Sequence, residues 1–182
     1  AQVDPTKEVK LAAFTRLAQM PARDTSIANT LVSLFNNIKF NELETRLEYA
    51  EAMRTSQFKY PVYEVLADWG SKLRYPDLLT NYQRNSNSGN AGTGNGTVGG
   101  DPNYGNRKQR AEFEKFVGIF NKVTQATLKA EDKNSPYQCK QWWNDNKAKI
   151  LAADKELIEK YRVEDLARNN KNNPLLPKKS AE

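Results

Sequence analysis

The sequence predicts an all-α protein built from antiparallel helical hairpins, stacked side by side as a short array. Apolar residues recur at helical spacing, prolines and capping residues stand where these segments begin, and strand-like alternation is rare. A Gly/Asn/Ser-rich stretch interrupts the pattern. We therefore expect N-terminal helical hairpins at 1–84, a flexible, disordered insertion at 85–106, a C-terminal helical hairpin at 107–168 and a flexible basic tail at 169–182.

The first helix is expected to begin at Asp4–Pro5, because Asp caps helices and Pro fits the first helical position. Pro21 ends it. Its predicted buried stripe consists of Val9, Ala13 and Leu17, with Phe14 and Ala18 beside it.

The next two helices show the same pattern. Asp24 or Thr25 caps the second helix, and Asn41 with Glu44 resembles a capping box at the start of the third. The expected buried face of the second helix contains Ile27, Leu31, Leu34, Phe35 and Ile38, and that of the third contains Leu43, Leu47 and Ala50.

Pro61 opens a short fourth helix, and Gly70 is expected to end it in a left-handed conformation. Its inward residues are Val62, Val65, Leu66 and Trp69. Another short segment is expected from Tyr75–Pro76 to about Tyr82.

Seven of the nine glycines lie in the insertion, which has too few apolar side chains to offset its ordering entropy. A long helix is expected from about Arg107 to Lys129, with one face formed by Phe113, Phe116, Val117, Phe120, Val123, Thr127 and Leu128. A last helix starts at Ser135–Gln138, where a cap, a proline and a capping-box Gln coincide, and reaches about Arg168.

The composition argues against an enzyme. The chain has no His, so Ser-His and Cys-His pairs within the chain are excluded, and Cys139 is the only cysteine. The formal G-x-G-x-x-G at Gly94, Gly96 and Gly99 lacks the preceding strand that a dinucleotide site requires. We therefore predict no catalytic residue, no cofactor and no metal.

The net charge is +6, and five of the six excess charges lie in residues 85–182. This asymmetry keeps an alternative open, a nucleic-acid or anionic-surface binder that uses the basic C-terminal half. Signature motifs of nucleic-acid binding are lacking, so a protein partner is favoured. A start at Ala1 without Met fits signal-peptide removal, which predicts an exported, periplasm-like location, and no apolar run is long enough for a membrane span.

Aromatic side chains provide the candidate contacts for a protein partner. Trp142 and Trp143 are adjacent on a helix and point about 100° apart, so one belongs in the core and the other at an edge or against a neighbour. The predicted partner-binding residues are Trp142, Trp143, Tyr137, Trp69, Tyr63, Lys147 and Arg107.

Two segments resemble known helical repeats. The run from Glu44 to Met53 resembles the second helix of a HEAT-like repeat, with Leu31, Leu34 and Phe35 in the first helix. Ser135–Gln138 followed by Trp142, Trp143 and Asn146–Lys147 is similar to the closing helix of exported bacterial HEAT-like proteins. The resemblance implies a non-catalytic scaffold that associates with itself, as a homo-oligomer, or organises an exported redox enzyme, as assembly subunits of nitrite oxidoreductase tubules do.

Overall fold

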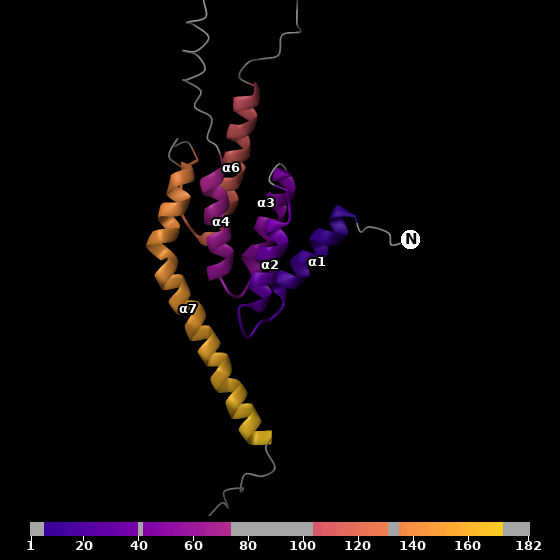
Figure 1. Cartoon of the computed structure of the whole chain (residues 1–182), viewed down its shortest axis with the longest axis vertical. Helices are drawn as coiled ribbons and strands as arrows, with labels where there is room; N and C mark the ends of the chain where they lie inside the picture. The colour runs from indigo at the N-terminus through magenta and orange to yellow at the C-terminus, as the bar shows by residue number, and fades with distance from the viewer. Residues whose placement is uncertain (1–5, 40–41, 74–103, 131–134, 173–182) are drawn as a thin grey trace, which may run out of the picture.

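The computed structural model describes residues 6–39, 42–73, 104–130 and 135–172 (Figure 1). All regular structure within these ranges is helical, which confirms the predicted all-α class. In chain order the elements are α1 (Lys7–Gln19), α2 (Ser26–Asn36), α3 (Leu43–Ala52), the 3-10 helix η1 (Met53–Thr55), α4 (Tyr60–Lys72), α6 (Tyr104–Thr124) and α7 (Ser135–Asn172). The segment predicted at 75–82 lies outside the described residues, as does the predicted tail beyond 172.

The core is centred on α4, which packs against α2, α6 and α7. Trp69 of α4 is 2% exposed, and its ring meets Phe116 and Phe35 edge-on at centroid distances of 4.8 and 5.4 Å. The apolar face of α6 supplies the rest of this core, as the helical spacing predicts, with Phe113, Phe116, Val117, Phe120 and Val123 all buried. Aromatic side chains therefore join the N-terminal and C-terminal helices into one core.

The prediction that Gly70 ends α4 is wrong. The helix continues to Lys72, and Gly70 does not have a positive φ. A Cβ atom at this position would lie 2.6 Å from the ring of Phe116 and 3.1 Å from Sγ of Cys139. The glycine is needed for space rather than for backbone freedom, because it lets α6 and α7 approach the backbone of α4.

Helix α6 begins at Tyr104, three residues before the predicted start at Arg107, and ends at Thr124 rather than at Lys129. Residues 104–106 are thus helical, although they were assigned to the insertion, and residues 85–103 lie outside the described ranges. Asp101–Pro102, which precedes the helix, is the same start signal as Asp4–Pro5.

After α6 the backbone turns at Gln125, where φ is 60°. The side chain of Asn121 then holds the following extended residues: its Nδ2 donates to the carbonyl of Leu128 (2.9 Å), and its Oδ1 accepts from the Leu128 amide (3.0 Å). Because the helix has ended, Thr127 is exposed and not part of the predicted apolar face.

Helix α7 is a single long helix along one side of the molecule (Figure 1). It passes the predicted end at Arg168 and continues to Asn172, because Pro174 is the first strong helix breaker after Ser135–Pro136. Asp154, in the middle of α7, links this helix to the start of α4. This carboxylate is 5% exposed and accepts hydrogen bonds from the backbone amides of Lys59 (3.1 Å) and Tyr60 (2.8 Å).

A second, smaller cluster lies further along α7. Phe58 is fully buried there, beside Ala22 and Ala28 and against the half-buried Leu157, Ile158 and Tyr161 of α7. The hydroxyl of Tyr161 also accepts a hydrogen bond from Nε2 of Gln57. These contacts hold α7 against the chain beyond Asp154.

Among the first three helices, the N-caps of α1 and α3 differ from the predicted ones. Thr6 is the N-cap of α1, where its side chain accepts from the amide of Val9, and Glu42 is the N-cap of α3. Asp4 and Asn41, the expected caps, lie outside the described residues. At α2 the N-cap is Thr25, as one alternative expects, while the Asp24 carboxylate accepts from the Ser26 amide at 2.8 Å. Hydrogen bonding from the side chain of Ser26, and secondly from its backbone amide, lowers the pKa of Asp24.

Candidate protein-binding groove

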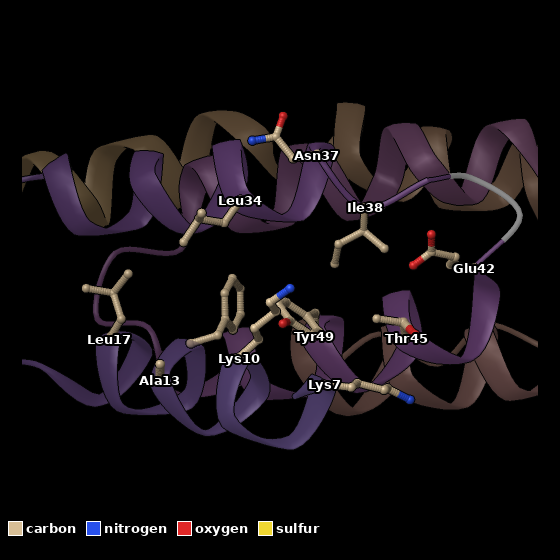
Figure 2. Close-up of a pocket in the computed structure, with 11 residues that line it drawn as sticks. Lys7, Lys10, Ala13, Leu17, Leu34, Asn37, Ile38, Glu42, Thr45 and Tyr49 are labelled. Atoms are coloured by element: carbon tan, nitrogen blue, oxygen red, sulfur yellow. The ribbon is translucent and has the colours of Figure 1, made fainter. Parts of the chain in front are cut away.

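A groove opens between α1, α2 and α3, with a cavity volume of about 710 Å³. Figure 2 shows Leu34 of α2 and Ile38, from the segment just after α2, pointing into it opposite Leu17 of α1 and Tyr49 of α3. Most of its lining is apolar, formed by Ala13, Phe14, Leu17, Leu34, Ile38 and Tyr49, and its polar side chains include Lys7, Lys10 and Glu42.

The floor of the groove is firmly packed. Phe14 and Tyr49 are 3% and 8% exposed, and their rings touch at a centroid distance of 4.5 Å with a tilt of 49°. Burial raises the pKa of the Tyr49 phenol. The floor therefore belongs to the core of the protein, and the groove is formed on a preorganised surface.

One wall contradicts the sequence prediction for α2. The structure buries Ala28, Leu31 and Phe35 on this helix, whereas Leu34 is 43% exposed. Consecutive helical residues point about 100° apart, so with Phe35 turned toward α4, Leu34 points into the groove.

The other wall contradicts the prediction for α1. The expected buried stripe was Val9, Ala13 and Leu17, but Val9 is 56% exposed, Ala13 is exposed and Leu17 is half-buried. Helix α1 instead packs through Phe14 and Ala18. It thus has two apolar sides, and the described residues bury only one of them. That doubled pattern is the signal by which the groove could have been found in the sequence.

A salt bridge links α1 to α3 at the end of the groove. Nζ of Lys7 lies 2.9 Å from Oε2 of Glu48, and the hydrogen bond to Glu48 raises the pKa of Lys7. Both side chains are more than two-fifths exposed, so the pair orients the groove rim more than it stabilises the fold.

Three of the predicted contact residues lie in the core. Trp69, Tyr63 and Trp143 are 2%, 8% and 7% exposed. Trp143 meets Tyr60 at a centroid distance of 4.9 Å, and Tyr63 meets Trp142 at 5.9 Å. These rings join α4 to α7 and leave almost no surface for a partner.

The other predicted contacts are scattered. Trp142 is half-buried against Phe120 at 5.4 Å, whereas Tyr137 is 69% exposed and Lys147 is exposed. Arg107 lies on α6, but its side chain is outside the described part. None of these residues lines the groove. The groove was not predicted from the sequence.

The thiol of Cys139 is fully buried. Burial raises the pKa of the Cys139 thiol to about 12, so it remains protonated at neutral pH.

Within the described ranges no three His, Cys, Asp or Glu side chains gather as a metal-binding cluster. None of the helices that the structure describes has the length and apolar content needed to cross a bilayer.

Comparison with known protein families, curated proteins and solved structures found no match to this chain.

Proposed function

We propose that this chain is a non-catalytic assembly protein that binds a partner protein through the groove between α1, α2 and α3. One observation carries the proposal: the side chains of Leu17, Leu34 and Ile38 form apolar walls that the described residues leave open. Exposed apolar surface that is concentrated in one hollow is typical of interaction sites. The occupant that fits is an amphipathic helix that inserts large apolar side chains.

The resemblance to exported HEAT-like proteins extends this proposal. It suggests that α2 and α3 form a repeat-like hairpin in a short stacked array, and that the partner belongs to an exported enzyme complex. The packing of α1 against both α2 and α3 supports a layered arrangement of neighbouring helices.

The surface charges favour a protein partner over an anionic polymer. Lys122 pairs with Glu51, and Arg110 pairs with Glu114 at 3.0 Å. Lys72 likewise pairs with Asp68 at 2.6 Å. Basic groups neutralised in this way contribute little to the release of counterions that drives nucleic-acid binding.

The test compares two charge insertions on α2. Leu34→Glu places a carboxylate in the groove, whereas Asn36→Glu places one at an exposed position of the same helix, about 200° around its axis. Wild-type and variant chains serve as baits for native extract of the source, and retained proteins are identified by mass spectrometry.

We expect a specific partner to be retained by wild type and by Asn36→Glu, and lost with Leu34→Glu. Circular dichroism verifies that both variants are folded. Equal retention by both variants would refute the groove as the binding site. A partner that is released from wild type by 0.5 M salt (about a 4 Å Debye length) would favour the anionic-surface alternative.

A further inference from the structure

Helix α7 has apolar residues on two opposite sides. The side that faces the protein carries Cys139, Trp143, Ile150, Leu157 and Tyr161. The other side exposes Leu151, Val163 and Leu166 by 36%, 55% and 53%, together with the exposed Ala148 and Ala152. A helix that only covered a core would be polar on its outer side. The outer side of α7 therefore has the pattern of a second contact.

Six exposed residues on this outer side form one stripe at heptad spacing, which is apolar at its two ends and charged in its middle. Ala148, Ala152, Lys155, Glu159, Arg162 and Leu166 follow one another at alternating intervals of four and three residues. This is the spacing of the a and d positions of heptads. All six residues are exposed, and they lie on the side of the helix opposite Leu157. We call these six residues the outer seam.

The outer seam is complementary to itself only when two copies run antiparallel. In the antiparallel register centred on Leu157, Lys155 stands opposite Glu159 of the second copy, and the reverse pair follows by symmetry. At both ends Ala148 stands opposite Leu166 of the second copy. A parallel pair in register would instead place Lys155 against Lys155.

The remaining layer fits the same register. Ala152 stands opposite Arg162 of the second copy, where the small side chain leaves room for the aliphatic stem of the arginine. Within one chain Arg162 already lies 3.6 Å from Glu159, so the two ion pairs can form one continuous network across the interface. We propose that two copies of this protein associate antiparallel through the outer seam of α7, in a two-fold symmetric dimer.

The dimer is separate from the groove. In Figure 1, α7 lies on one flank of the molecule and α1 on the other. Two-fold pairing through α7 thus leaves both grooves accessible and makes the dimer bivalent for a partner. Dimerisation through α7 is independent of what the groove binds, because Leu34→Glu leaves the outer seam unchanged.

Charge reversal tests the pairing. The full chain is measured by sedimentation velocity over a range of concentrations, as wild type, Lys155→Glu, Glu159→Lys and the double variant. Each single reversal places like charges at two symmetry-related positions, so the dissociation constant should rise at least tenfold. The double variant restores opposite charges and should return to within about threefold of wild type. Glu64→Lys, an exposed reversal on α4, is the matched control and should have no effect.

Disulfide trapping tests the direction. Cys139 is buried, so cysteines introduced at exposed positions report on the interface. A mixture of Ala148→Cys and Leu166→Cys chains should form a mixed disulfide, and neither chain alone should cross-link. A wild-type chain that is monomeric at all concentrations, single reversals without effect, a double variant that stays weak, or cross-linking of Ala148→Cys with itself would each overturn the proposal.

Discussion

The interface between α4 and α7 and the groove between α1, α2 and α3 both bring apolar side chains of neighbouring helices together, but only the first is closed. At the first, Trp143 and Tyr63 of facing helices meet other rings and are almost completely buried. At the second, Leu34 and Leu17 point into open space above a packed floor. Apolar periodicity therefore predicts that a helix face will be buried, without predicting whether the chain itself buries it.

The largest expected effect lies in the closed core, where α6 packs against α4. Phe116 is fully buried between Trp69, Phe113 and Phe120, and it faces the backbone of α4 at Gly70. Phe116→Ala should lower the free energy of unfolding by about 3–5 kcal/mol, because it removes a packed ring and leaves a cavity. Urea denaturation followed by circular dichroism measures the loss. A change below about 1 kcal/mol would show that this interface is not closely packed.

A smaller loss is expected where α7 caps α4. Asp154→Ala leaves the partly buried amides of Lys59 and Tyr60 without their acceptor, which should cost about 1–3 kcal/mol. Asp154→Asn is the matched variant, since its amide oxygen still accepts one hydrogen bond, and it should retain part of the stability. Equal losses for the two variants in urea denaturation would contradict the capping role.

The buried thiol of Cys139 should make the free energy of unfolding depend on pH in the alkaline range. Burial raises the pKa of Cys139 to about 12, against 9.0 for the free thiol. Below pH 9 the thiol is neutral in both states. Between pH 9 and 12 only the unfolded chain ionises it, so stability falls as pH rises, by about 1.4 kcal/mol per pH unit at most. The fall should be smaller in Cys139→Ala; identical pH profiles for this variant and wild type would exclude the effect.

The open region should respond least in stability. Leu34→Ser removes a side chain that is 43% exposed, so its cost should stay below about 1 kcal/mol. Leu31→Ser, one helical turn away and fully buried, is the matched control and should cost several times more. Similar costs for both in urea denaturation would mean that the groove is filled within the chain.

The sequence predicted the fold correctly where several local signals agreed. The face of α6 from Phe113 to Val123 and the start of α7 at Ser135–Pro136 were predicted because spacing and capping signals agree there. The prediction for Gly70 failed because this glycine is required by the close approach of Phe116, a residue distant in sequence. The sequence alone cannot reveal such a contact.

The groove was missed for a related reason. On α1, Val9 and Phe14 both belong to apolar patterns at helical spacing, and periodicity does not decide which pattern faces the core. The outcome depends on Tyr49, which packs against Phe14 from another helix. Several aromatic residues predicted as partner contacts, Trp69 above all, pack in the core, because burying a large ring is strongly favourable.

The most direct test of the groove is photo-crosslinking at position 34 in native extract of the source. A benzophenone amino acid replaces Leu34 in the full chain, and a matched chain carries it at Asn36. We expect position 34 to form an adduct with a different protein and position 36 to form none. If the products at position 34 are instead cross-links within the same chain, the groove is covered by the protein itself and the proposed binding site is wrong.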